Sequence, residues 1–186
     1  MNRRSRRAFL GSAATAAVAL AGCTADGTGS DGSGDGGGST EPTVTSEGSG
    51  GGDGLRLETL AVAGSPGGEF SIDPTGTPVL VDFFATWCAP CKPQMAELRA
   101  VRERFPDLHM LSLTRETDTE GIASFWQNYE GTWAVAPDPD LAAFRDYGVT
   151  GVPVLVVLAP DGTEVWRHRG LAAADSIAGR IREATA

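Results

Sequence analysis

The sequence predicts a single α/β domain over residues 55–186, with a mixed β-sheet that helices cover on both faces. Two observations support this fold class. Apolar segments of strand length alternate with segments whose apolar residues recur every three or four positions, as they do in amphipathic helices. Near the end of the chain, Asp161-Gly162 is typical of a hairpin turn, which adds an antiparallel pair of strands to the alternating pattern.

Strands are expected where apolar and β-branched residues run without helical periodicity. Residues 57–62 and 69–72 flank the turn-forming cluster Ser65-Pro66-Gly67-Gly68, which predicts a hairpin with its turn at that cluster. The remaining expected strands, in chain order, cover residues 79–85, 108–114, 133–136, 154–159 and 163–169.

Helices are expected between these strands. Over residues 119–129, apolar side chains recur at steps of three and four and supply one apolar face. Asp138-Pro139-Asp140 is predicted to open a short helix that ends at Gly148, because glycine adopts a positive φ without steric cost. The full set of expected helices covers residues 92–104, 119–129, 138–147 and 172–183.

Residues 1–22 are predicted to be an export signal. Ser5-Arg6-Arg7-Ala8-Phe9-Leu10 resembles the twin-arginine export motif, whose cargo crosses the membrane already folded. The apolar run over residues 8–21 is too short and too rich in alanine to span a bilayer of about 30 Å. The alternative is an ordinary secretory signal that contains a chance pair of arginines.

Residues 23–54 are predicted to be a lipidated cysteine followed by a disordered tether. Leu20-Ala21-Gly22-Cys23 resembles a lipobox, which implies cleavage before Cys23 and a diacylglyceryl group on its sulfur. The alternative is a spare thiol near a signal cleavage site. Residues 24–54 contain twelve glycines and six acidic residues but no basic or aromatic residue, so they have almost nothing to bury.

The charge of the chain excludes some classes of partner. Its formal net charge is −9, with 24 acidic and 15 basic residues, and it has no basic cluster after residue 7. This distribution argues against nucleic acid or anionic lipid as a partner of the domain. Adaptation to high salt and simple solubility both account for the acidic surface.

Two cysteines stand between the expected strand 79–85 and the expected helix 92–104, in Trp87-Cys88-Ala89-Pro90-Cys91. Thiols three residues apart at the start of a helix can close into a disulfide and open again. Unpaired amides and the dipole at the helix N-terminus can lower the pKa of Cys88 from about 8.5 into the range of roughly 3.5 to 7. Cys91, one helical turn further on, is predicted to be shielded and to act as the resolving thiol.

The same spacing is also half of a zinc ligand set, but neither a cofactor nor a metal site is expected. No third cysteine remains for zinc if Cys23 is lipidated, and His109 and His168 are too far apart for the usual pairing of histidine ligands. Both histidines are interpreted as surface residues at strand ends. A metallochaperone that binds Cu(I) through Cys88 and Cys91 remains an alternative, because soft thiolates suit that ion.

Residues 55–186 resemble the thioredoxin family, in particular its membrane-tethered TlpA/ResA-like branch. Val81-Asp82-Phe83 matches the position of the buried aspartate of the family, which implies that Asp82 helps to remove the proton from the resolving thiol. A carboxylate in a core strand is unfavourable without a partner, so a raised pKa is expected for Asp82. The alternative is a salt-bridged or edge-exposed aspartate.

Gly151-Val152-Pro153 matches the cis-proline loop of the family, which lies against the redox pair. The resemblance implies that the backbone of Val152 pairs with an extended client segment and that Pro153 faces the two cysteines. Trp87, Ala89 and Pro90 are the other expected client contacts. The segment between Thr114 and Ala136 matches the additional helix and strand of the TlpA-like branch.

One departure from the family concerns the helix after the cysteines. Many relatives carry a proline five residues after the second cysteine, where this chain has Ala96, and Pro93 comes earlier instead. A kink in this helix is therefore expected to be shifted or missing.

The resemblance implies a thiol-disulfide oxidoreductase that is lipid-anchored at the extracytoplasmic face of the cell membrane. Its expected activity is to reduce disulfides of client proteins, as in cytochrome c maturation, with electrons from a transmembrane donor protein. A disulfide-forming oxidase is an alternative, because potentials in the family run from about −270 to −120 mV. A peroxidase is less well supported, because the surroundings of Cys88 lack a Thr-x-x-Cys pattern.

Overall fold

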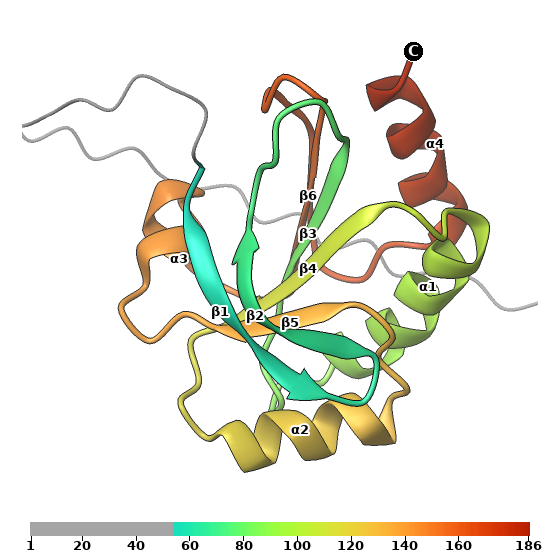
Figure 1. The fold of residues 1–186 in the computed structure, drawn as a ribbon. Coiled ribbons are helices and arrows are strands. Elements are labelled where there is room, and N and C mark those ends of the chain that lie inside the picture. Colours follow the sequence, from blue (N-terminus) through green and yellow to red (C-terminus); the bar gives the residue numbers. More distant parts are fainter. Residues whose placement is uncertain (1–53) are drawn as a thin grey trace, which may run out of the picture. The chain divides into compact units, whose positions relative to one another are not determined.

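The computed structural model describes residues 54–186 of the 186-residue chain. The predicted export signal, Cys23 and almost all of the predicted tether lie outside the described residues. Within the described part, the strands form a five-stranded sheet with the order β5-β4-β3-β6-β7 and a separate two-stranded sheet, β1-β2 (Figure 1). None of the helices between residues 54 and 186 is long and apolar enough to cross a membrane.

The five-stranded sheet is mixed, and its central strand leads to the two cysteines. β3 (Val79–Phe83) runs parallel to β4 (His109–Thr114), which runs parallel to β5 (Ala134–Pro137). β6 (Val154–Leu158) is antiparallel to β3, and β7 (Glu164–Arg169) is antiparallel to β6. β3 and β6 are buried along their whole length, which explains why their residues are all apolar except Asp82 of β3.

Helices cover both faces of this sheet, as the sequence predicts. The disulfide-side core contains both cysteines, Leu80 of β3 and the apolar residues of three helices: α1 (Cys91–Arg104), α2 (Thr119–Asn128) and α4 (Ala174–Ala184). The α3-side core, on the other face, contains Phe83 and the buried residues of α3 (Ala142–Asp146). Figure 1 shows α1 and α4 side by side, with α3 at the opposite side of the sheet.

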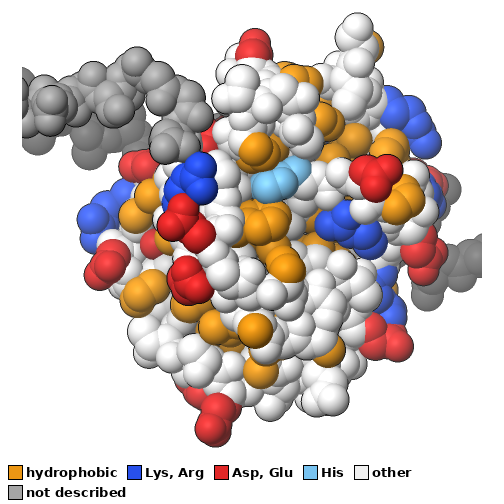
Figure 2. All heavy atoms as spheres, in the orientation of Figure 1, with side chains coloured by type: hydrophobic (Ala, Val, Ile, Leu, Met, Phe, Trp, Pro, Cys, Tyr) orange, Lys and Arg blue, Asp and Glu red, His pale blue; other side chains and the backbone are white. Residues whose placement is uncertain are grey.

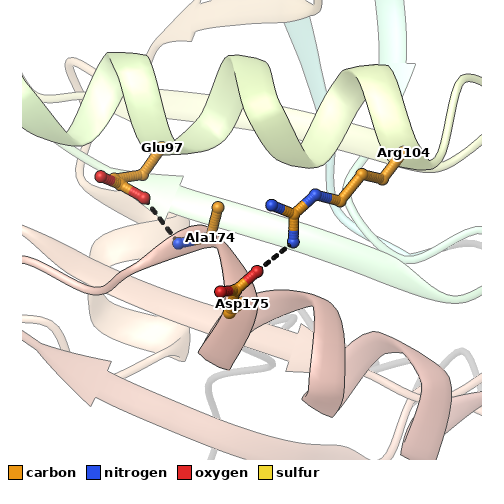
Figure 3. Close-up of polar contacts among 4 residues, drawn as sticks. All are labelled: Glu97, Arg104, Ala174 and Asp175. Carbon is orange, nitrogen blue, oxygen red and sulfur yellow. Dashed lines mark hydrogen bonds and ion pairs between the residues drawn. The ribbon is translucent and has the colours of Figure 1, made fainter.

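Polar contacts tie α1 to α4 (Figure 3). The residue before α4, Ala173, has no side chain that can cap the helix. The carboxylate of Glu97 in α1 takes this role and accepts a hydrogen bond of 2.7 Å from the backbone N–H of Ala174. Near the end of α1, Arg104 forms an exposed ion pair of 2.5 Å with Asp175. The helix that begins at Cys91 therefore has a fixed position against the last helix of the chain.

The predicted N-terminal hairpin is present, but its predicted turn is wrong. β1 (Arg56–Val62) and β2 (Ser65–Ser71) pair directly across a turn at Ala63-Gly64, where Gly64 has a φ of 79°. Ser65-Pro66-Gly67-Gly68 belongs to β2, in register with β1. The Ser65 hydroxyl also accepts a hydrogen bond from the backbone N–H of Val135, so this residue joins the hairpin to β5.

The predicted helices are all present; α2 starts at Thr119 as predicted, and the other three start at different residues. α3 begins at Ala142 rather than at Asp138, whose carboxylate caps it by accepting hydrogen bonds from the N–H groups of Ala142 and Phe144. Gly148, with a φ of 59°, follows its end as predicted. α1 begins at Cys91 and continues unbroken through Pro93, which lies in the first turn, where its missing N–H removes no helical hydrogen bond.

Figure 2 shows one face of the molecule, in the orientation of Figure 1. Acidic and basic side chains are interspersed over the coloured part of this face, between apolar patches. The basic side chains therefore form no continuous positive surface on this face, in a chain of net charge −9.

Candidate active site

Cys88 lies in the connection between β3 and α1, and a disulfide joins it to Cys91, the first residue of α1. The connection from Phe83 to Cys91 is short, and the N–H of Phe84 donates to the carbonyl of Leu113, so this segment continues the pairing between β3 and β4. Cys88 is 3% exposed and Cys91 is 2% exposed. Sequence reasoning predicted a shielded Cys91, and the structure buries both residues of the pair to the same extent.

The start of α1 provides the amide that a reactive thiol needs. The backbone N–H of Cys91, the first residue of the helix, is shared between the sulfur and the carbonyl oxygen of Cys88, each at 3.2 Å. An N-terminal amide of a helix has no partner within the helix, so it can stabilise negative charge on this sulfur. This contact distinguishes Cys88 from Cys91, which burial alone does not.

Asp82 is a buried carboxylate in the central strand. It is 3% exposed, and one of its oxygens accepts a hydrogen bond of 2.9 Å from the hydroxyl of Ser112, which in turn accepts one of 2.9 Å from Nε1 of Trp133. The other oxygen has no hydrogen-bond partner. Burial raises the pKa of Asp82 to about 7, although the hydrogen bond from Ser112 acts in the opposite direction.

The carboxyl group of Asp82 lies on the same face of the sheet as the disulfide. Side chains alternate along a strand, so Asp82 shares a face with Leu80, which packs in the disulfide-side core with both cysteines. The alternative of a salt-bridged or edge-exposed aspartate does not fit, because no ion pair within residues 54–186 involves Asp82, which lies in the central strand. A carboxyl with a pKa near 7 can both accept and donate a proton at neutral pH.

The loop before β6 reaches the same edge of the sheet as the cysteines. β6 is antiparallel to β3, and its first residue, Val154, is in register with Phe83, the last residue of β3. The peptide bond between Val152 and Pro153 is cis. Pro153 is buried, whereas Val152 is partly exposed and packs against both cores.

The other predicted client contacts lie on the surface beside the pair. Trp87 is 66% exposed, and Ala89 and Pro90 are also exposed. Large apolar side chains are seldom this accessible without a partner, which makes the indole of Trp87 a candidate contact surface. Exposed residues therefore precede and follow the buried Cys88 in the chain.

The two histidines do not approach the cysteines through any contact seen between residues 54 and 186. His109 is half-buried and stacks on Phe70, and its Nε2 contacts the carbonyl of Ser71 at 2.7 Å. His168 stacks on Trp166. Both histidines are partly exposed, and His109 is the first residue of β4, so the interpretation of surface residues at strand ends holds in part, with Phe70 and Ser71 of the N-terminal hairpin in contact with His109.

Glu116 is a site residue that sequence reasoning missed. Its carboxylate accepts hydrogen bonds from the backbone N–H of Thr86 at 2.7 Å and from the Thr86 hydroxyl at 2.6 Å. The hydroxyl of Thr114 donates to the same carboxylate at 3.0 Å. Glu116 therefore fixes the backbone two residues before Cys88, and its only sequence signal is its position directly after the predicted strand 108–114.

Gln94 is a second missed residue, one turn after Cys91. Its amide is almost fully buried and pairs twice with the backbone of Ala172, donating to the carbonyl at 3.1 Å and accepting from the N–H at 2.8 Å. This pairing holds the first turns of α1 against the segment that precedes α4. A polar residue in a helix gives no sign in the sequence of such a distant partner.

Comparisons with known proteins agree with this geometry. A family model described as Redoxin matches residues 38–179. The thioredoxin of Chlamydia muridarum is 33% identical over 99 residues, which cover 53% of this chain and 74% of that protein. The thiol-disulfide oxidoreductase ResA of Bacillus cereus is 25% identical over 97 residues, which cover 51% of this chain and 56% of ResA.

A solved structure supports the predicted fold class. The structure of MTB dsbF in its mixed oxidized and reduced forms superposes with a TM-score of 0.63 at 21% identity, covering 71% of this chain and 96% of that chain. A likeness at this identity concerns the fold, and it confirms a single thioredoxin-like domain with a mixed sheet between helices. The chain spans little more than half of the length of ResA.

The raised pKa of Asp82 makes the stability of the domain depend on pH. Between the ordinary carboxyl value near 3.8 and about 7, the folded chain holds a proton that the unfolded chain releases, so stability falls as the pH rises through this range. Asp82→Asn lacks this contribution. We expect the unfolding free energy of the wild type, relative to this variant, to fall by about 3 kcal/mol from pH 5 to pH 8 in urea titrations.

Asp140→Asn is the matched control, because Asp140 is an exposed aspartate whose removal leaves the buried carboxyl intact. This variant should follow the wild type at both pH values. Identical pH dependence of the wild type and Asp82→Asn would contradict a buried carboxyl that binds a proton near neutral pH.

Proposed function

The chain belongs to the Redoxin family, and from this premise we propose that it is a thiol-disulfide oxidoreductase that reduces disulfides of client proteins through Cys88 and Cys91. The observation that carries the proposal is the Cys88–Cys91 disulfide at the start of α1, with the N–H of Cys91 directed at the sulfur of Cys88. This arrangement lets the pair exist as a disulfide and favours Cys88 as the attacking thiol once it is reduced.

The reaction proceeds in two exchanges. The thiolate of Cys88 attacks one sulfur of a client disulfide, which forms a mixed disulfide and releases the other client sulfur as a thiolate. The thiolate of Cys91 then attacks the sulfur of Cys88, which forms the Cys88–Cys91 disulfide and releases the second client thiolate. The client gains the two electrons that the pair loses, and protons complete both client thiols.

Asp82 has the properties of the proton acceptor for the second exchange. Cys91 must lose its proton in a buried place, where water cannot readily accept it. Asp82 lies on the same face of the sheet, and its raised pKa, about 7, is closer to that of a thiol than an ordinary carboxyl pKa is. A carboxylate at this position can therefore take the proton as the Cys91 thiolate forms.

The client is expected to bind as an extended segment across the surface of the site. Val152 is partly exposed, precedes the start of β6 and has a backbone that can pair with such a segment. Trp87, Ala89 and Pro90 supply exposed contacts on the other side of the cysteines. Main-chain pairing accepts many sequences, which suits an enzyme that acts on proteins.

The burial of the pair supports the reducing direction. Both cysteines are almost inaccessible, and a buried carboxyl lies on their face of the sheet, so negative charge is disfavoured on the sulfur of Cys91, at which no helix amide of residues 54–186 is directed as one is at Cys88. A dithiol whose thiolate is poorly stabilised gives up its electrons readily, whereas stabilisation of the reduced form makes a pair oxidising. These two features favour a low reduction potential.

The N-terminal sequence supports an extracytoplasmic location for the enzyme. Residues 1–23 carry the features of a twin-arginine lipoprotein signal, and residues 24–54 have the composition of a tether. We infer that the domain is held at the extracytoplasmic face of the cell membrane. There it would act on exported clients, such as those of cytochrome c maturation, and would draw electrons from a transmembrane donor protein.

Replacement of the resolving cysteine tests the mechanism. In Cys91→Ser, Cys88 can attack a client disulfide but nothing releases the product, so mixed disulfides with a protein client should accumulate on non-reducing gels. Cys88→Ser should form none and should show no turnover. If Cys91→Ser traps no client while Cys88→Ser does, the roles of the two cysteines are reversed.

The reduction potential tests the direction. Equilibration of the full chain with a series of glutathione or dithiothreitol ratios should give a value at or below about −250 mV, as expected for a reductant. A value near −120 mV would assign the chain to disulfide formation instead.

The anchor is tested at the mature N-terminus. Mass spectrometry of the protein from membranes should find a chain that begins at Cys23 and carries a diacylglyceryl group, and Cys23→Ala should release the protein from the membrane fraction. A mature chain that lacks Cys23, or carries it unmodified, would contradict the anchor but not the redox activity.

A further inference from the structure

A cavity of about 290 Å³ is lined by residues from the edge of the sheet that also carries the cysteines. Two arginines and several apolar residues line it, among them Arg115, Leu141, Phe144, Arg145, Val149 and Thr150. No acidic residue lines it. None of these residues has a part in the exchange chemistry described above.

The order of the strands places this cavity at the same edge of the sheet as the cysteines. Arg115 directly follows β4, and Cys88 follows β3, which is parallel to β4. Thr150 lies three residues before Pro153, in the loop that leads into antiparallel β6. The carboxyl edge of parallel strands is where open α/β sheets bind their ligands.

Val152 contacts both the core that contains the cysteines and the core that contributes residues to the cavity. Phe144 and Val149 of the cavity belong to the α3-side core, and the cysteines belong to the disulfide-side core. Val152 packs against both. A client segment that pairs with the backbone of Val152 can therefore extend from the cysteines toward the cavity.

The two arginines give the cavity a local positive charge. The guanidinium of Arg115 lies over the ring of Phe144, 5.6 Å from its centroid, and that of Arg145 donates to the backbone carbonyl of Asp140. Neither is in an ion pair with a carboxylate of residues 54–186, whereas five other arginines of this part of the chain are: Arg56, Arg99, Arg104, Arg167 and Arg180. Both side chains are exposed.

We propose that this cavity binds an acidic side chain of the client, a few residues from the cysteine that Cys88 attacks. The partly exposed side chain of Leu141 offers apolar contact to the methylene groups of such a side chain, and the guanidinium groups of Arg115 and Arg145 bind its carboxylate. This selectivity rests on the proposed function, because it concerns the client of the same reaction. It also opposes the net charge of −9, which would otherwise repel acidic clients.

The test compares two disulfide-linked peptides that differ only in charge. One carries glutamates and the other carries lysines at the positions that flank the cysteine, and the reduced full chain is mixed with each in single-turnover experiments. We expect the second-order rate constant to be about tenfold higher for the acidic peptide at low salt, and this preference to shrink as salt screens the charges. Arg115→Glu combined with Arg145→Glu should abolish or reverse it.

Arg182→Glu is the matched control. Arg182 is also exposed and also lies 5.6 Å from the centroid of an aromatic ring, that of Phe105, but it belongs to α4 and does not line the cavity. This variant changes the charge by the same amount as either single Arg→Glu substitution in the cavity and should keep the wild-type preference. Arg115→Gln removes one positive charge without adding a negative one and should give an intermediate ratio.

The outcomes separate the inference from the function on which it rests. Equal rates for the two peptides, or an acidic preference that survives in the double variant, would overturn the acidic site while leaving the oxidoreductase intact. A wild-type chain that reduces neither peptide nor a small aromatic disulfide would overturn both.

Discussion

The hydrogen bonds from Thr86 to the carboxylate of Glu116 hold the segment on which the whole site depends. This segment is the short connection between β3 and α1, and it carries Cys88. Glu116 itself follows β4, so the connection is fixed to the neighbouring parallel strand rather than to its own. Because Asp82 is the residue before the last one of β3 and Cys91 is the first residue of α1, the clamp sets the position of Cys88 relative to both.

Most of the fold could be predicted, because the central strands of the main sheet are buried and leave apolar sequences such as that of β6. The errors arise where a residue pairs with a distant one. Ser65-Pro66-Gly67-Gly68 has turn composition, yet β1 pairs with it and the Ser65 hydroxyl binds β5, so these contacts override local preference. The start of α3 was predicted too early for a different reason. Asp138 lies before the helix and only its carboxylate contacts the first helical N–H groups.

The site could be predicted only as far as local patterns reach. Cys88 and Cys91 are close in sequence, and Asp82 is visible as a charged residue within an apolar strand. The partners that give these residues their properties are not visible. Ser112 is the neighbour of Asp82 across β3 and β4, which depends on strand register, and Glu116 reaches Thr86 only because those two strands are adjacent.

The arrangement separates chemistry from recognition. Both cysteines and Asp82 are buried, so burial opposes charge on the sulfur of Cys91 and on the carboxyl of Asp82. Trp87 and Val152 are accessible and lie on either side of the pair. A client that binds both surfaces brings its own sulfur to Cys88 and excludes water, which makes attack depend on binding. Selectivity in such an enzyme must come from the exposed rim, and Arg115 supplies charge there that the buried centre cannot carry.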